Sequence, residues 1–368
     1  MKEEEEFNQR ILNIFNIGKK DLKLKGHKSK HWEMYDKRSF NLETLKNFRG
    51  QGNLSSGLDD QDSFFSFKIF SNVVRELSEE YILKNCEKKN IGNSNSLLQY
   101  KEVYIDFNKL IHIHWFKDIE KYVLNKNIKN FCEIGGGFGS LAELIIKNYN
   151  IKLLSIDLPE ANLLTSYYLK NKFPSKNFFL YDDYLEKRLL TYNDFMKNDV
   201  IILPPEIIID KKIKIDFFIN TRSMMEMNYD IINKYFNLIH SHISSKGYFL
   251  NINRYEKNTT GAAIRIAEYP YDEFWEVIKS NPSFNQKWIH FLLTQRQFSN
   301  YSNNIKKELI KINELGKKYY IKFPILLNKF TKTKKFIRII LNTFFLNKII
   351  NFIGKLFLKV GNKLSNIK

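Results

Sequence analysis

The sequence predicts an α/β fold built on a mainly parallel sheet, and three observations support this. From residue 126 to about residue 300, short apolar runs typical of strands alternate with longer runs of helical periodicity. A glycine-rich turn within Phe131–Ser140 (FCEIGGGFGS) joins the first of these strands to a helix. Acidic residues follow the carboxyl ends of successive strands. In a doubly wound sheet these ends share one edge, where ligands bind.

The length and composition of the chain allow such a domain together with additions at both ends. Its 368 residues are 43% apolar and 15% aromatic, which is enough for a large core. We predict a mostly helical N-terminal cap at 1–125, which would include an acceptor region, an α/β domain at 126–300, and a basic tail at 301–368. Two cysteines, Cys86 and Cys132, and an acidic start (MKEEEE) favour a reduced, cytoplasmic setting without an export signal.

The glycine turn has the features of a ligand-binding loop. Glycines at 135, 137 and 139 remove every Cβ from one side of the turn, so a ligand can lie against bare backbone. The G-x-G-x-G spacing after Glu133 does not match the dinucleotide pattern G-x-G-x-x-G, nor a phosphate loop with its Lys-Ser/Thr pair. The alternative is an ordinary glycine-rich turn that packs a helix on a strand.

The pattern acid-x-Gly-x-Gly-x-Gly resembles the first motif of the class I S-adenosylmethionine-dependent methyltransferases. The resemblance implies a Rossmann-like sheet, with Glu133 facing the methionine amino group and with Gly135, Gly137 and Gly139 beneath the methionine and ribose. The charges agree with it, because this cofactor carries an ammonium and a sulfonium but no phosphate. A carboxylate is therefore favoured at this position.

Two further acids follow predicted strands. The apolar run Leu153–Ile156 ends in Asp157, about 20 residues beyond the glycines, where a carboxylate can accept both ribose hydroxyls. Pro159 then opens a helical pattern, as proline does in a first turn. We predict Phe178–Tyr181 as the third strand. The residue after it, Asp182, is where the resemblance places a contact to adenine.

Candidates for the chemistry follow the predicted fourth strand, Ile215–Ile219. Asn220, Arg222 and Glu226 lie in the loop that, in an open α/β sheet, faces the transferring group. An alcohol accepts a methyl group only if its proton is removed, so a carboxylate or imidazole must be near. We predict Glu226 as the base, with Arg222 orienting the acceptor and Asn220 contacting acceptor or cofactor. The structural alternatives are an ion pair for Arg222 and a solvated helix start for Glu226.

Later elements complete the predicted sheet. We expect helices at Tyr229–His242 and Tyr271–Ser280, and strands at Tyr248–Asn253 and Gln286–Gln297. The last strand carries His290, the alternative base. A lone histidine in an apolar strand is more often a hydrogen-bonded core residue.

Two aromatic segments upstream of the glycine turn allow more than one reading. His112 and His114, spaced as on one face of a strand, would supply two metal ligands, and with no obvious third we predict no metal site. Trp32 and Tyr35 lie in a segment that would suit a lid whose rings stack on a sugar. Core packing is the alternative for both rings.

Several stretches together are similar to the sugar O-methyltransferases of bacterial surface-polysaccharide gene clusters. They cover about residues 28–300 and are EIGGGFGSLAELI, SIDLPEANLLTSYYL, FFINTRSMMEM and YFLNINRYEK, with HWEMYDKR and NFRGQGNLSSGLDDQ upstream. The resemblance implies methylation of a hydroxyl on a sugar nucleotide or lipid-linked glycan. The glycine motif and Asp157 do not identify the acceptor. RNA, protein or a small metabolite remain alternative acceptors, and a non-catalytic scaffold that kept the fold is a further alternative.

The tail carries most of the excess charge. Residues 301–368 hold 16 Lys or Arg and two Asp or Glu, which is +14 of the total +19. Within it, 336–360 is strongly apolar, but Arg338, Lys348 and Lys355 argue against a transmembrane span. We expect a basic amphipathic helix that lies on anionic lipid or docks on protein. The stretch is too apolar for an arm that follows nucleic-acid phosphates.

Overall fold

The computed structural model describes residues 2–21, 30–33, 39–50, 72–94, 97–258, 261–284, 286–297 and 304–320. The predictions for Tyr35, for residues 51–71 and for the tail from residue 321 onward lie outside the described residues. The helices are α1 (Lys2–Lys20), α3 (Lys30–Glu33), α4 (Leu42–Lys46), α6 (Glu79–Asn85), α7 (Phe107–Tyr122), α8 (Ser140–Asn148), α9 (Pro159–Lys172), α10 (Tyr181–Lys187), α11 (Tyr192–Lys197), α12 (Tyr229–His242) and α13 (Asn304–Tyr320), with short turns η1 (Leu124–Lys126), η2 (Met224–Glu226) and η3 (Ile266–Glu268).

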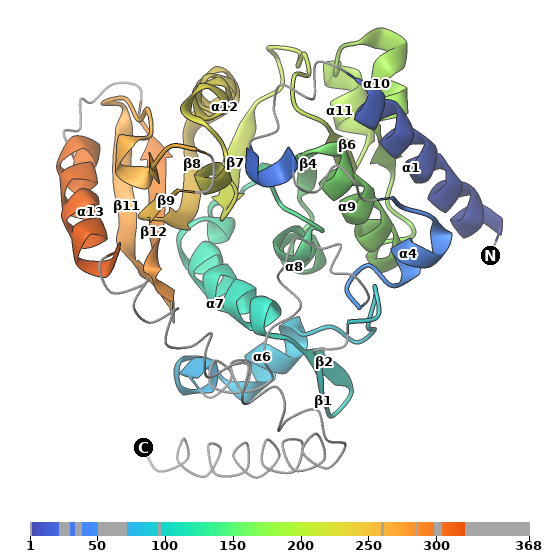
Figure 1. The fold of residues 1–368 in the computed structure, drawn as a ribbon, viewed down its shortest axis with the longest axis horizontal. Coiled ribbons are helices and arrows are strands. Elements are labelled where there is room, and N and C mark those ends of the chain that lie inside the picture. The colour runs from blue at the N-terminus through green and yellow to red at the C-terminus, as the bar shows by residue number, and fades with distance from the viewer. Residues whose placement is uncertain are drawn as a thin grey trace.

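The strands are β1 (Leu98–Tyr100), β2 (Val103–Ile105), β3 (Asn130–Ile134), β4 (Lys152–Ile156), β5 (Phe178–Phe179), β6 (Val200–Leu203), β7 (Ile215–Thr221), β8 (Ile243–Arg254), β9 (Glu256–Lys257), β10 (Ile264–Arg265), β11 (Trp275–Ser283) and β12 (Gln286–Arg296). Eight of them form one sheet in the order β11-β12-β8-β7-β3-β4-β6-β5 (Figure 1). Within this sheet β12 alone runs antiparallel to its neighbours. The predicted α/β fold with a mainly parallel sheet is confirmed.

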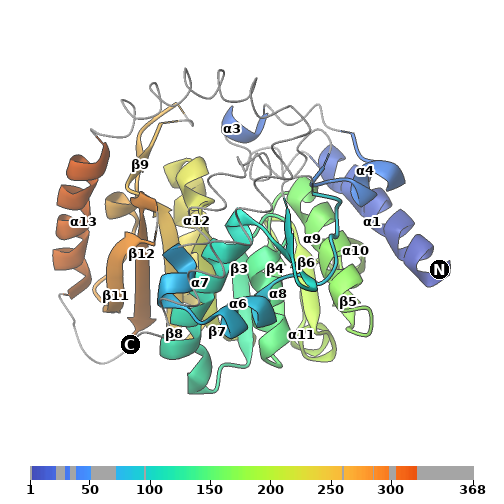
Figure 2. The same ribbon diagram turned by 90° about the horizontal axis from the view of Figure 1, so that it is seen from below.

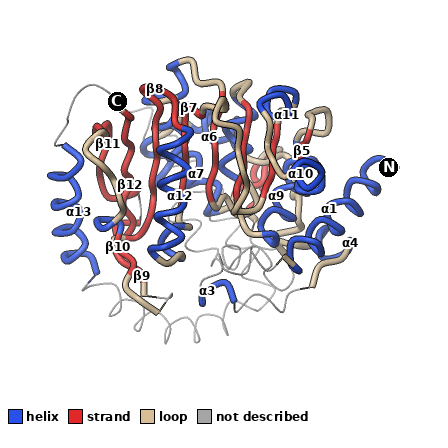
Figure 3. Tube along the Cα trace, turned by 90° about the horizontal axis from the view of Figure 1, so that it is seen from above, coloured by secondary structure: helices blue, strands red, loops and turns tan. Residues whose placement is uncertain are grey.

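Helices cover both faces of the sheet (Figures 2 and 3). On one face, Phe131 of β3 packs in a core with residues of α1, α7, α8 and α9. On the other, Cys132 and Ile134 pack in a core with residues of α11, α12 and α13. Side chains alternate between faces along a strand, so a strand buried on both sides reads as a continuous apolar run. This explains why the central strands were easy to find in the sequence.

The N-terminal residues belong to the same core as the sheet. Ile11 and Phe15 of α1 are buried against α9, and α1 and α13 lie at opposite ends of the sheet (Figure 1). Several helices precede β3, together with the hairpin of β1 and β2. No helix in the described part of the chain is long and apolar enough to cross a bilayer.

Most predicted elements of the domain are present. The runs at Leu153–Ile156 and Ile215–Ile219 lie in β4 and β7, and Gln286–Gln297 contains β12. The helix predicted at Tyr229–His242 is α12, with the same ends. The helix that Pro159 opens is α9.

Three predictions were wrong. The segment at 271–280 is not a helix, because Trp275–Ser283 forms β11 and pairs antiparallel with β12. The stretch holding His112 and His114 is helical, and Asp106 caps its first turn by accepting the Lys109 N–H at 2.7 Å. The predicted third strand is shortened to β5 at the outer edge of the sheet. The strand beside β4 is instead β6, a short apolar run that Pro204 follows.

Candidate functional site

The glycine turn between β3 and α8 has a backbone that only glycine adopts without strain. Gly135, Gly137 and Gly139 have φ of +68°, +64° and +85°. A Cβ on Gly135 would lie 1.8 Å from Ser223 Oγ, so the loop after β7 packs directly against this glycine. A Cβ on Gly137 would meet nothing within 4 Å. The turn therefore has one side that is closed by the protein and one that is open to a ligand.

Glu133 lies beneath this turn, and its carboxylate has no partner among the described residues. Its side chain is fully buried, and neither carboxylate oxygen has a hydrogen-bond partner among the described residues. The carboxylate lies so close to the backbone that a Cβ on Gly136 would be 2.3 Å from Oε2. Burial, and then the charge of Asp157, raise the pKa of Glu133 to about 8. Because an unpaired buried carboxylate is costly, it indicates a cationic ligand at this position.

Asp157 meets the same turn from the end of β4. Its Oδ2 accepts the Gly137 N–H at 3.0 Å and its Oδ1 accepts the Leu158 N–H at 2.7 Å. Burial raises the pKa of Asp157 to about 7, although these two hydrogen bonds oppose the shift. The structure thus brings together Glu133, Asp157 and the three glycines, as the sequence predicted. Their contacts with a cofactor stay a prediction.

Asn220 ties this edge of the sheet together. Its side-chain amide donates to the Ile134 carbonyl at 2.8 Å, and its Oδ1 accepts from the Met224 N–H and from Asn253 Nδ2 at 3.1 and 2.8 Å. The residue is fully buried. It joins the end of β3, the end of β8 and the loop after β7, so it positions that loop. Its contact with a cofactor or acceptor remains a prediction.

Glu226 is held in an ion pair. Oε1 of Glu226 accepts from Nζ of Lys257, and the side chain is 15% exposed, which excludes the solvated helix start. Arg222 and Arg254 interact electrostatically with the same carboxylate. The negative charge of Glu226 also raises the pKa of Asp157, so the pair of Glu226 and Lys257 lies near the glycine turn. The role of Glu226 as a base is not tested by these contacts.

Two other predicted site residues have partners elsewhere. His290 is fully buried in β12 with Tyr255 Oη 3.0 Å from Nδ1 and Ser280 Oγ 2.7 Å from Nε2, and burial lowers its pKa to about 4. This matches the core alternative. Asp182 lies in the first turn of α10, where Arg10 of α1 donates to both of its oxygens at 2.7 Å. It follows the outermost strand of the sheet.

An apolar pocket lies between α1, α9, the chain that follows β5 and the end of β6. It is a narrow crevice, since its empty volume of about 340 Å³ includes open solvent, and its walls include Phe15, Pro159, Leu163, Tyr181 and Pro204. The sequence did not predict this pocket, because α1 is more than a hundred residues away from the other walls.

His112 and Arg254 are two further candidates for contact with a ligand. The sequence did not identify either of them as a binding residue. His112 Nδ1 lies 3.1 Å from Oγ of Ser140, the first residue of α8. Burial, with smaller effects from Lys109 and Arg222, lowers its pKa to about 3, so the ring is neutral at pH 7. In the sequence, His112 was a candidate only together with His114, as one of two metal ligands. Within the described ranges, no group of three or more His, Cys, Asp or Glu residues could hold a metal ion.

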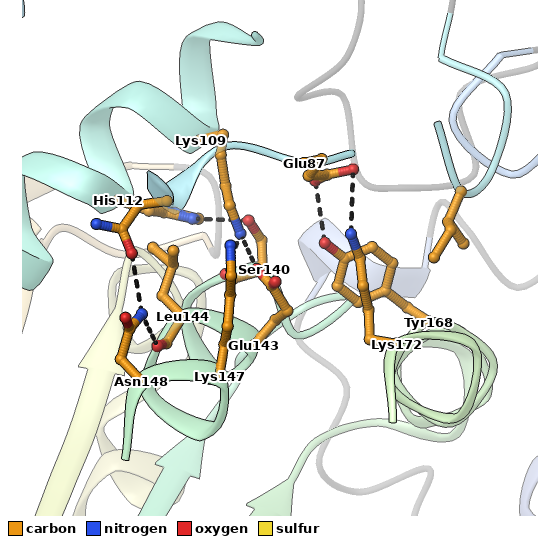
Figure 4. A network of polar contacts seen from close by, with 12 residues as sticks. Glu87, Lys109, His112, Ser140, Glu143, Leu144, Lys147, Asn148, Tyr168 and Lys172 are labelled. Atoms are coloured by element: carbon orange, nitrogen blue, oxygen red, sulfur yellow. Dashed lines mark hydrogen bonds and ion pairs between the residues drawn. The ribbon is translucent and has the colours of Figure 1, made fainter. Parts of the chain in front are cut away.

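A buried charge cluster of Arg49, Glu87 and Asp106, here called the Arg49 cluster, packs against the glycine turn. Arg49 donates to Glu87 at 3.0 Å and to Asp106 at 2.7 Å, and its guanidinium lies 5.1 Å from the ring centre of Phe138 in the glycine turn. Glu87 also accepts from Tyr168 of α9 at 3.0 Å, and Figure 4 shows this contact in the polar network between α7, α8 and α9. The Arg49 cluster therefore links the N-terminal residues to the two segments that face the ligand, the glycine turn and α9.

Comparisons with known proteins identify no family for this chain. It matches no known protein-family profile, and no curated protein matches its sequence. Solved structures similar to it include the pyocyanin biosynthetic protein PhzM, at 11% identity over 49% of this chain and 54% of that chain with a TM-score of 0.33. The mitomycin 7-O-methyltransferase MmcR shares 10% identity over 66% and 71%, with a TM-score of 0.32. The ribosomal protein L11 methylase from Lactobacillus delbrueckii subsp. bulgaricus shares 13% identity over 52% and 81%, with a TM-score of 0.31.

The last two of these structures are methyltransferases by name, and the chain spans about half the length of the first. Likeness at these identities and scores carries no argument about activity. The function of this chain therefore has to be argued from the geometry of its own site.

Proposed function

We propose that the chain is an S-adenosylmethionine-dependent O-methyltransferase whose acceptor is a sugar hydroxyl in a surface-polysaccharide precursor. The observation that carries the proposal is the unpaired, buried carboxylate of Glu133 beneath a glycine turn that is open at Gly137. The ionised form of a buried carboxyl that has no partner among the described residues is stabilised by a cationic ligand, and it would repel a nucleotide phosphate. S-adenosylmethionine meets both requirements, because it carries an ammonium group and has no phosphate.

The other residues of the site fit the remaining parts of the cofactor. Asp157 uses one lone pair of each oxygen for backbone N–H groups, which leaves acceptor capacity for the ribose hydroxyls. The predicted contact of adenine with Asp182 would compete with the ion pair that Asp182 forms with Arg10. When bound, the cofactor supplies an electrophilic methyl group on its sulfonium. The residues of the chain bind and orient it.

The acceptor is proposed from the sequence resemblance and from the loop after β7. Glu226 would accept the proton of the attacking hydroxyl, and Arg222 would orient the acceptor. The acceptor would be a sugar nucleotide or lipid-linked glycan. For a lipid-linked acceptor, the tail at 336–360 would bring the enzyme to an anionic membrane surface.

Replacing Asp157 by alanine is expected to weaken S-adenosylmethionine binding at least tenfold. The lost contact is a charge-assisted hydrogen bond, worth about 1.5 to 3 kcal/mol. Calorimetric titration of the full chain measures it, with Asp230→Ala as the control because Asp230 is an exposed aspartate in α12. If the wild-type chain does not bind the cofactor, the proposal is wrong. If it binds, transfer of labelled methyl to sugar nucleotides rather than to RNA or protein tests the acceptor.

A further inference from the structure

The loop after β7 places a cation that has no ion-pair partner among the described residues beside the glycine turn. Arg222 is half-buried, and the one hydrogen bond that its side chain makes to the described residues is a long one, from Nη1 to Asn108 Oδ1 at 3.4 Å. No carboxylate in the described part of the chain forms an ion pair with it. Burial, and then the positive charge of Arg254, lower the pKa of Arg222 to about 10. A guanidinium that is desolvated and left unpaired at a ligand-facing loop is a candidate binding group.

Two more cations, Arg254 and Lys257, lie close to Arg222. Arg254 ends β8 and Lys257 lies in β9, and burial lowers the pKa of each. Arg222 and Arg254 also lower the pKa of Lys257, so the three positive charges repel one another. The carboxylate of Glu226 is the one negative charge that opposes all three shifts. The formal charge of these four residues is therefore positive, in a setting where burial makes the repulsion costly.

The backbone at Arg222 holds this arrangement in place. Arg222 is in the left-handed region with φ 60°, and its N–H donates to the Ile252 carbonyl of β8 at 2.7 Å. A non-glycine residue in this region is strained, and such strain is found where the surroundings fix a functional side chain. The next residue, Ser223, contacts Gly135. The cations thus lie directly beside the proposed methyl-donor site.

We propose that Arg222, with Arg254 and Lys257, forms a subsite for an oxyanion of the methyl acceptor, either a phosphate or a carboxylate. That the bound molecule is a methyl acceptor rests on the proposed function, but binding of an oxyanion at this subsite can be tested independently of it. A planar guanidinium binds two oxygens of such a group at once. A bound oxyanion would neutralise the excess positive charge and fix the sugar next to Glu226. A neutral sugar would leave the repulsion in place.

The experiment titrates the full chain, with and without saturating S-adenosylhomocysteine, with glucose 1-phosphate, glucuronate and methyl glucoside. We expect at least one of the two anions to bind at least tenfold more tightly than the neutral glycoside, and its affinity to fall with added KCl. Arg222→Gln is expected to lower that affinity at least tenfold. Arg222→Lys, which keeps the charge, is expected to lose less. The anion whose affinity falls identifies the group.

Arg265→Gln is the matched control, because Arg265 lies nearby in β10 but is already paired with Glu256 and Glu268. It should bind both anions as the wild-type chain does. The proposal is overturned if no anion binds the wild-type chain, or if Arg222→Gln binds anions normally. It is also overturned if the variant loses affinity for S-adenosylmethionine alone, since Arg222 would then hold the methionine carboxylate. Anion binding without cofactor binding would sink the proposed function and leave the subsite standing.

Discussion

Replacing Glu133 by glutamine is expected to weaken S-adenosylmethionine binding while stabilising the free protein at neutral and higher pH. Glu133 is buried without a hydrogen-bond partner among the described residues, and its pKa is raised to about 8. Its charge is useful only when a cation is bound. Loss of a charge-assisted contact to an ammonium should cost about 1.5 to 3 kcal/mol of binding free energy, a tenfold or greater drop in affinity.

The effect on stability follows from the direction of the pKa shift. The ordinary pKa of this carboxyl is 4.5, so between pH 4.5 and 8 the folded protein keeps a proton that the unfolded chain releases. The free energy of unfolding of the wild-type protein therefore falls as pH rises through this window, by at most about 1.4 kcal/mol per pH unit from this group. Glutamine has no such proton. The stability of the variant relative to wild type should rise from pH 5 to pH 8 and then level off.

Urea unfolding of the free protein at pH 5, 6, 7 and 8 measures this difference. Glu186→Gln is the control, since Glu186 is exposed in α10 and should show no such pH trend. Calorimetry at pH 7 adds a second test. Because Glu133 is mostly protonated at pH 7, binding of the ammonium should release a proton in the wild-type protein but not in the variant. A variant whose relative stability is flat from pH 5 to 8 would show that this carboxyl is not the buried, unpaired group described.

The parts of the site that could be predicted from the sequence are those encoded by local patterns. The β3–turn–α8 unit and the end of β4 each combine an apolar run with a nearby glycine or acid, so Glu133 and Asp157 could be found without long-range information. Strand order could not be found in this way. The segments that became β5 and β6 are both short and apolar, and which of them pairs with β4 depends on tertiary packing.

The errors have the same origin. The segment at 271–280 has no strong local preference, and its pairing with β12 decides that it becomes β11. The Arg49 cluster joins residues 38 and 57 positions apart, and the pair of Arg10 and Asp182 spans 172. Contacts of this kind leave no periodic signal in the sequence. They are nevertheless what holds the N-terminal residues against the site.

Replacing Arg49 by methionine is expected to cause the largest loss of stability, about 3 to 5 kcal/mol. Arg49 is 2% exposed, and its removal leaves Asp106 buried without its cation and Glu87 with only the more distant Lys172, at 3.9 Å. Urea unfolding at pH 7 measures the loss. Lys101→Met is the matched control, because the Lys101 side chain in its pair with Glu79 is largely exposed and should contribute little to stability.

The pH dependence of this loss distinguishes a charge effect from a packing defect. Burial raises the pKa of Glu87, but the charges of Arg49 and Lys172 outweigh it and hold the pKa below its ordinary value. That stabilisation is present above the ordinary pKa and is lost as pH falls through the lowered one. Without Arg49, Glu87 can take up a proton instead, so the deficit of the variant should shrink between pH 7 and pH 4. A deficit that stays constant over this range would assign the effect to the lost side-chain volume.

The same substitution should reach the ligand site, because the Arg49 cluster contacts both segments that face the ligand. The guanidinium lies against the ring of Phe138 in the glycine turn, and Glu87 holds Tyr168 on α9, the helix that follows Asp157. Loosening these contacts should weaken S-adenosylmethionine binding in the fraction that is still folded at 15 °C. Lys101→Met should leave binding unchanged. If Arg49→Met lowers stability but not affinity, then the turn and α9 hold their geometry on their own, and the cluster serves only to attach the N-terminal residues.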